Sequence, residues 1–213
     1  MTTPMEGTHL METFVSAAWL TDVGRMRNNN EDALIVADLS ERKVVNDSGE
    51  ASLRRIGERG WLLAVADGMG GAQAGEVASH IATERLVQTM VQTLIDAGVL
   101  TPEEATHSSQ RNVILKALGA KDEIEPDLSR VGLSRGDHLL LCSDGLSNKI
   151  DAVEMRDIAL KANTLDAACA RLVALANDRG GEDNITVILA RFDGMGLPAL
   201  GRSADQHILV ERL

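Results

Sequence analysis

Short apolar runs, bounded by polar residues and glycines, recur along the chain and predict buried β-strands. The predicted strands cover residues 14–21, 33–39, 61–66, 127–133, 138–143 and 185–190. Two of them, 127–133 and 138–143, flank a short loop with a glycine, which predicts that they pair as a hairpin. Residues 40–60 are polar and predict a surface excursion in which a further hairpin can form.

Other stretches repeat apolar residues at helical spacing. The longest, 77–97, carries one apolar stripe without a change of phase and predicts a single helix. Asp151 and Thr164 occupy N-cap positions and predict two later helices, the first of which ends at about Lys161. Strands and helices are mixed along the chain, so the predicted fold class is α+β.

Length and periodicity indicate one domain. The 213 residues are 44% hydrophobic, which is enough for a substantial core. We expect an N-terminal arm at 1–13, a folded domain at 14–193 and a C-terminal tail at 194–213, because the last segment lacks a strong periodicity.

Charge and apolar length exclude several classes of partner. The formal net charge of −11 argues against nucleic acids and acidic membranes, which favour a basic surface. No apolar stretch has the length of a membrane span, and no signal peptide is evident at the N-terminus. The cysteines lack metal-ligand spacing. We therefore expect a cytoplasmic protein.

Acidic residues stand at the ends of four predicted strands. One isolated Asp-Gly pair is more often a simple turn, but recurrence at four strand ends makes a shared site the better interpretation. Carboxylates that gather at one site repel one another, and a hard divalent cation relieves that repulsion because it prefers oxygen ligands. The acidic pairs and Asp-Gly turns are Glu31–Asp32, Asp67–Gly68, Asp144–Gly145 and Glu182–Asp183.

Four segments carry a family resemblance. Residues 22–33, 65–79, 139–146 and 181–187 resemble successive motifs of the bacterial metal-dependent protein serine/threonine phosphatases of type 2C, in the family's order. The resemblance implies an antiparallel β-sandwich flanked by helices. It also implies hydrolysis of phosphoserine and phosphothreonine by a hydroxide that two Mn²⁺ or Mg²⁺ ions activate. The substrate would be a phosphorylated protein, the product of a serine/threonine kinase.

The same resemblance assigns roles to residues of these motifs. Asp67 is the central catalytic ligand, shared by both metal ions, and Arg27 grips the substrate phosphate. The other residues serve the metals directly, through metal-bound water, or by orienting a ligand. They are the Gly68 carbonyl, Asp144 and Asp183 as direct ligands, Glu31 and Asp32 through water, and Asn184 as the residue that orients Asp183.

One part of the family pattern is missing. Relatives carry a block of strands with a Gly-Thr-Thr segment and a Gly-Asp-Ser-Arg tetrad after the first helix, and neither occurs here. The stripe over 77–97 predicts that two family helices are fused and that the sandwich is truncated internally. The alternative function is therefore a catalytically impaired, phosphatase-like module that binds or regulates a partner. Because lost strands expose edges, we expect low stability, self-association and weak catalysis.

Overall fold

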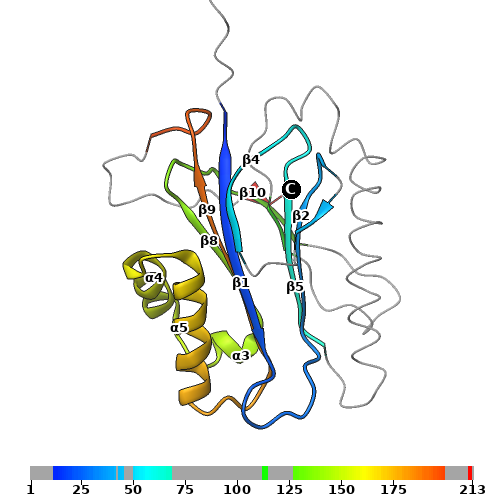
Figure 1. The fold of residues 1–213 in the computed structure, drawn as a ribbon, viewed down its shortest axis with the longest axis vertical. Helices are drawn as coiled ribbons and strands as arrows, with labels where there is room; N and C mark the ends of the chain where they lie inside the picture. Colours follow the sequence, from blue (N-terminus) through cyan, green and yellow to red (C-terminus); the bar gives the residue numbers. More distant parts are fainter. Residues whose placement is uncertain are drawn as a thin grey trace, which may run out of the picture.

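Antiparallel sheets and a layer of helices form the part of the chain that the computed structural model describes (Figure 1). This part comprises residues 12–41, 43–45, 50–68, 112–114, 127–199 and 211–212. The first sheet has the order β4 (Glu50–Arg55), β1 (Phe14–Asp22), β9 (Ile185–Asp193) and β8 (His138–Cys142). The second has the order β3 (Lys43–Val44), β2 (Ala33–Asp38) and β5 (Trp61–Ala66). A third contains β10 (Glu211–Arg212), β7 (Asp127–Arg130) and β6 (Asn112–Ile114).

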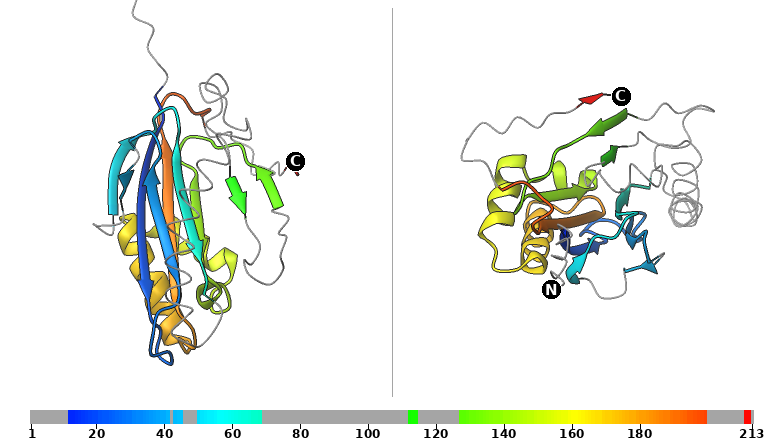
Figure 2. Two further views of the ribbon diagram at one scale, coloured as in Figure 1. Left: turned by 90° about the vertical axis from the view of Figure 1, so that its right-hand side faces the viewer. Right: turned by 90° about the horizontal axis from the view of Figure 1, so that it is seen from above.

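Alternation along β1 divides the core into two layers. Successive side chains of a strand point to opposite faces. Val15, Ala17 and Trp19 lie in an apolar cluster that includes Val36 of the second sheet, whereas Ala18 packs toward the helices. The first sheet is thus covered on both faces, and it separates the second sheet from the helical layer (Figure 2).

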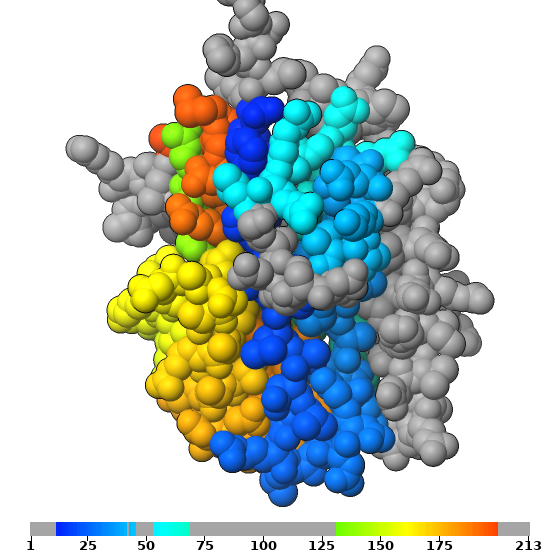
Figure 3. Space-filling model, in the orientation of Figure 1, coloured from blue at the N-terminus to red at the C-terminus, as the bar shows by residue number. Residues whose placement is uncertain are grey.

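Three helices occur in the described part: α3 (Asp144–Ser147), α4 (Ala152–Lys161) and α5 (Leu165–Asp178). The predicted caps are confirmed, since the Asp151 carboxylate accepts from the Glu154 N–H and Thr164 Oγ1 accepts from the Ala167 N–H. In the space-filling view α4 and α5 form the yellow and orange surface beside the blue strands (Figure 3). This layer closes one side of the core.

Most predicted strands are confirmed, but the predicted hairpin is wrong. β7 pairs with β6 and β10, whereas β8 pairs with β9 in another sheet. The connecting turn is tied to other segments, because the Arg135 N–H donates to Pro198 O and the Gly136 N–H donates to Phe192 O, both at 2.8 Å. Tertiary contacts therefore choose the strand partner, although the loop has the composition of a hairpin turn.

Several other expectations concern the remaining segments. The predicted fused helix at 77–97 and the junction beside it lie outside the described residues. In the C-terminal segment, Leu197 is buried and β10 pairs with β7, so the described parts of 194–213 contact the body of the protein. The domain boundaries stay a prediction. Within the described ranges, no helix has the length and apolar character needed to cross a membrane.

Candidate functional site

Strand register brings the predicted acidic residues to one end of the two main sheets. Ala33 pairs with Ala66, which places Asp32, just before β2, beside Asp67, just after β5. In the other sheet the pair Cys142–Val187 brings the end of β8, which is followed by Asp144, to the start of β9. In an antiparallel pair the end of one strand lies beside the start of the other. The acidic residue that follows one strand therefore lies near the one that precedes its partner, at the lower end of Figure 1.

A buried serine connects the two sheets at this end. Ser143 Oγ donates to Asp32 Oδ2 at 2.7 Å and accepts from the Thr186 N–H at 2.9 Å. Burial raises the pKa of Asp32, hydrogen bonds from Ser143 and Thr186 oppose this, and the charges of nearby acids add to the rise. The Asp32 carboxylate is therefore fixed in place but costly to ionise.

Asp67 experiences the same crowding. Partial burial raises its pKa to about 6, with further increases from the charges of Asp32, Asp144 and Asp183, against an opposing hydrogen bond from the backbone of Asp144. Part of the side chain remains exposed, so it stays open to a ligand from solvent. The raised pKa of Asp67 thus follows in part from the charges of three other carboxylates at this end of the sheets.

Two glycines allow the backbone segments of the site to approach closely. A Cβ atom at Gly68 would lie 2.5 Å from the Glu31 carbonyl oxygen. A Cβ atom at Gly145 would overlap the Asn184 carbonyl oxygen. Any side chain at either position would push apart the segments that carry the acidic residues. Steric crowding thus explains why glycine follows Asp67 and Asp144 in this fold.

Arg27 lies at the acidic end, as predicted for a phosphate-binding residue. Its Nη2 donates to Asp183 Oδ2 at 3.0 Å, and its Nε donates to the Glu182 carbonyl oxygen at 3.4 Å. Arg25 instead pairs with Asp178 at the end of α5, also at 3.0 Å. The two arginines of this loop therefore have different surroundings, and Arg27 is the one beside the predicted metal ligands.

The backbone N–H of Asn184 donates to Asp183 Oδ1 at 2.9 Å, and the orienting role of Asn184 stays a prediction. Its side chain also bonds the backbone of residues 23–31, which the sequence did not indicate. Ser143 is a residue of the site that sequence reasoning missed. A polar side chain between Cys142 and Asp144, at the end of an apolar strand, was the available signal.

The donor set fits a hard divalent ion in its chemistry. Asp67, Asp144 and Asp183 supply carboxylate oxygens, and their repulsion is what a cation would relieve. In their present positions, however, the described residues contain no group of three or more His, Cys, Asp or Glu side chains that could hold a metal ion. Side-chain rotation would have to close the set, including release of Asp183 from Arg27.

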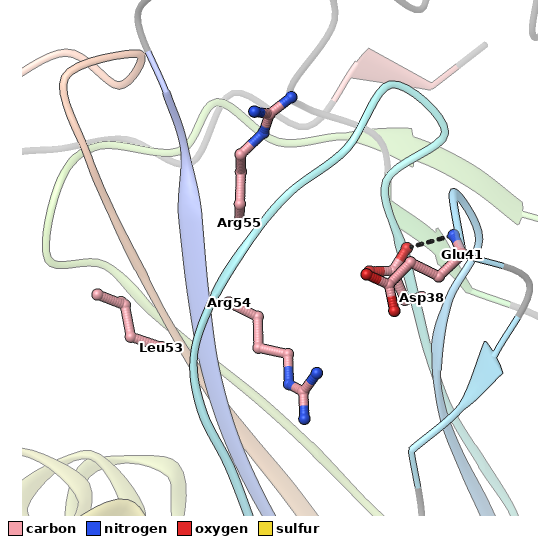
Figure 4. A pocket seen from close by; sticks show the side chains of 5 residues that line it. All are labelled: Asp38, Glu41, Leu53, Arg54 and Arg55. Carbon is pink, nitrogen blue, oxygen red and sulfur yellow. Dashed lines mark hydrogen bonds between the residues drawn. The ribbon is translucent and has the colours of Figure 1, made fainter.

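A small pocket at the other end of the second sheet is a weaker candidate (Figure 4). It measures about 300 Å³ and is lined by Asp38, Glu41, Leu53, Arg54 and Arg55. The buried Asp38 carboxylate already accepts from the Ser40 and Glu41 N–H groups. Asp32 immediately precedes β2 and Asp38 is its last residue, so roughly 20 Å of strand separates this pocket from the acidic end.

Comparisons with known proteins point to one family. Residues 45–127 match a sequence profile described as Protein phosphatase 2C. The protein phosphatase PhpP of Streptococcus pneumoniae is 49% identical over 100 residues, which are 47% of this chain and 41% of PhpP. The match therefore spans less than half of that relative's length.

Solved structures show the same fold over more of the chain. The Mycobacterium tuberculosis serine/threonine phosphatase PstP/Ppp superimposes with a TM-score of 0.56 and 27% identity, over 84% of this chain and 99% of that one. The catalytic domain of PstP in complex with two manganese ions gives a TM-score of 0.54 at 24% identity, over 85% and 99% of the two chains. The predicted α+β sandwich is confirmed.

Proposed function

The chain belongs to the type 2C protein phosphatase family, and on that premise we propose that it hydrolyses phosphoserine and phosphothreonine esters in proteins. The observation that carries the proposal is the convergence of four motif carboxylates, Asp32, Asp67, Asp144 and Asp183, at one end of the sandwich. PhpP and PstP/Ppp carry phosphatase names, which supports the same reaction class. Phosphorylated products of a serine/threonine kinase are the proposed substrates.

We assign two divalent ions, Mn²⁺ or Mg²⁺, to the acidic end. They would be held by Asp67 as the shared ligand and by the Gly68 carbonyl oxygen, Asp144 and Asp183 as the other direct ligands. Glu31 and Asp32 would act through water. When bound, such a pair supplies Lewis-acid stabilisation of charge on phosphate and an activated water. The PstP complex with two manganese ions supports this use of the fold.

Arg27 binds the substrate phosphate in this proposal. Its planar guanidinium can donate two parallel hydrogen bonds to phosphate oxygens. Its side chain is about half exposed, so a phosphate can approach from solvent. Arg27 Nη2 bonds Asp183, which keeps the guanidinium group next to the carboxylates that would bind the metal ions. A phosphate ester bound here would therefore contact Arg27 and the metal ions together.

A catalytically impaired binding or regulatory module is the second candidate. The absence of the Gly-Thr-Thr and Gly-Asp-Ser-Arg segments from the sequence favours it. The retained carboxylates favour the enzyme. The two functions differ in turnover, because a binding module would hold a phosphoprotein without releasing phosphate.

Phosphate release from a phosphothreonine peptide decides between them. We expect Mn²⁺-dependent multiple turnovers by the purified chain, abolished by EDTA and by Asp67→Asn. Binding of the peptide without phosphate release would support the module. Equal activity of wild type and Asp67→Asn would contradict the proposed metal-dependent reaction.

A further inference from the structure

The side chain of Asn184 is buried and makes three hydrogen bonds, all to backbone groups of the loop between β1 and β2. Its Nδ2 donates to the carbonyl oxygens of Val23 and Asn29, each at 2.9 Å, and its Oδ1 accepts from the Glu31 N–H at 2.7 Å. Only 5% of the residue is exposed. Both N–H donors of the amide, and one of the two acceptor positions of Oδ1, are therefore used by the loop.

The orientation of this amide follows from its partners. Two of the three are carbonyl oxygens, which only accept, and the third is an N–H, which only donates. Exchanging Oδ1 and Nδ2 would leave all three bonds mismatched inside the protein. A buried group without its partner is costly, so the side chain is locked in one orientation.

These bonds join both ends of one loop to a single residue. Val23 opens the loop, Glu31 is the last residue but one, and Arg27 lies between them. The backbone of Asn184 meanwhile bonds the carboxylate of Asp183 at 2.9 Å. One residue thus contacts the loop of the phosphate-binding arginine on one side and a predicted metal ligand on the other. In Figure 1 the blue loop after β1 and the orange segment before β9 lie together at the lower end.

We propose that Asn184 is a positioning residue that sets where Arg27 stands relative to the carboxylates, and thereby the affinity of the site for a phosphate group. The inference rests on the proposed phosphatase function and extends it. The role assigned from the sequence, orientation of Asp183, concerns a metal ligand. The role assigned here concerns the substrate, and it acts through the loop backbone and not through contact with phosphate.

The loop has other anchors, so loss of the Asn184 side chain should alter it without unfolding the protein. The N–H groups of Arg25 and Met26 both donate to the Gly181 carbonyl oxygen, at 2.7 and 3.2 Å. Arg25 also donates to the carbonyl oxygen of Asn177. These bonds hold residues 25 and 26. Further along, Asn30 Nδ2 donates to Thr21 Oγ1 at 2.7 Å, and the Asn184 side chain bonds the backbone of Asn29 and Glu31.

A double-mutant cycle tests the proposal. We would compare Asn184→Ala, Arg27→Ala and the double variant in the full chain with Mn²⁺, measuring KM for a phosphothreonine peptide and inhibition by orthophosphate. Asn184→Ala should raise KM and weaken orthophosphate inhibition by on the order of tenfold, the effect of about one hydrogen-bond free energy. Because Asn184 acts through Arg27, the double variant should be no weaker than Arg27→Ala.

Asn177→Ala is the matched control. Its amide Nδ2 also holds a polar group near this loop, Asp22 Oδ1 at 3.0 Å, but bonds no backbone group of residues 23–31. Its effect on phosphate affinity should be small and should add to that of Arg27→Ala. Additive losses for Asn184→Ala and Arg27→Ala would show a general structural role and would overturn the proposal.

Hydrogen exchange separates this inference from the proposed function. Asn184→Ala should speed exchange of the Glu31 amide by about tenfold, because its acceptor is lost, while amides in the middle of β9 keep their protection. Unchanged Glu31 exchange would overturn the positioning role even in an active enzyme. Faster exchange in a chain without phosphatase activity would support the loop contact and contradict the proposed function instead.

Discussion

Arg27 donates from Nη2 to Asp183 Oδ2 over 3.0 Å, which joins the predicted phosphate-binding residue to a predicted metal ligand. The pair is partly exposed, at 46% for the arginine and 41% for the aspartate, so the bond is weak enough to exchange. A phosphate and a metal ion would each compete for one partner of this pair. The two halves of the proposed site are therefore in direct contact.

Arg27→Ala should mainly raise KM for a phosphopeptide, by on the order of tenfold or more, because a charge-assisted bond to phosphate is lost. Arg25→Ala is the matched control. Arg25 lies on the same loop as Arg27 and forms an ion pair of the same 3.0 Å length, but with Asp178 at the end of α5. Steady-state kinetics should show a much larger rise in KM for Arg27→Ala than for Arg25→Ala, because Arg25 contributes only to holding the loop. Equal kcat/KM in wild type and Arg27→Ala would exclude the phosphate-binding role.

Ser143→Ala should destabilise the fold by about 1–3 kcal/mol, because the buried N–H of Thr186 loses its acceptor and the carboxylate of Asp32 loses one of its two hydrogen-bond donors. The pKa of Asp32 should rise further, since the Ser143 bond lowers it. Urea denaturation and NMR titration measure the two effects. Ser147→Ala, exposed in α3, should stay within about 0.5 kcal/mol of wild type. Equal stability of the two variants would refute the bridging role of Ser143.

Metal affinity should depend on pH through Asp67. Its carboxyl must ionise to bind an ion, and its pKa is about 6, so Mn²⁺ affinity should fall by about tenfold per pH unit below 6. Calorimetric titrations from pH 5 to 7.5 would measure this. An affinity that is flat across this range would show that Asp67 is not a ligand whose ionisation limits binding.

Without added metal, the free energy of unfolding should fall as the pH rises, which is opposite to the rise of Mn²⁺ affinity with pH. The pKa of Asp67 is raised in the folded state from 3.8 to about 6, so the folded chain holds the proton more tightly than the unfolded chain. The contribution to stability is complete below about pH 4 and is lost as the pH rises through about 6. Denaturation curves should show this loss, and Asp67→Asn should remove it. The same pH slope in the variant would assign the slope to other groups.

Gly145→Ala should weaken both folding and Mn²⁺ binding. The added methyl group would overlap the Asn184 carbonyl oxygen, and relief requires α3 to move away from the start of β9. That shift carries Asp144 away from Asp183. Overpacking of this kind costs about 1–3 kcal/mol. Thermal unfolding and Mn²⁺ titration of the variant measure both losses. A variant as stable as wild type would mean that this close approach is not required.

The sequence predicted the strands and helix starts well because they depend on local patterns. The runs at 14–21, 61–66 and 185–190 are apolar over strand length, and Asp151 and Thr164 cap helices by bonds within one turn. The pairing partner of each strand was harder to predict. The run at 127–133 is adjacent in sequence to β8, but β8 pairs with β9 at the edge of the first sheet, and no local spacing records that preference.

The candidate site could be assembled from motifs, but its supporting contacts could not. Acids at strand ends were visible in the sequence, and antiparallel pairing explains why they meet. The bonds from Ser143 to Asp32 and from Asn184 to the Arg27 loop span 111 residues and up to 161 residues of sequence. Such contacts depend on the packing of the two sheets, which only the structure supplies.

Calorimetric titration with Mn²⁺ at neutral pH, on wild type and Asp67→Asn, tests whether the carboxylates at the end of the two sheets form a dinuclear metal site, as we claim. We predict that wild type binds two ions and that Asp67→Asn loses this binding while keeping its fold by circular dichroism. Binding of equal strength and stoichiometry in both proteins, or none in either, would contradict the claim.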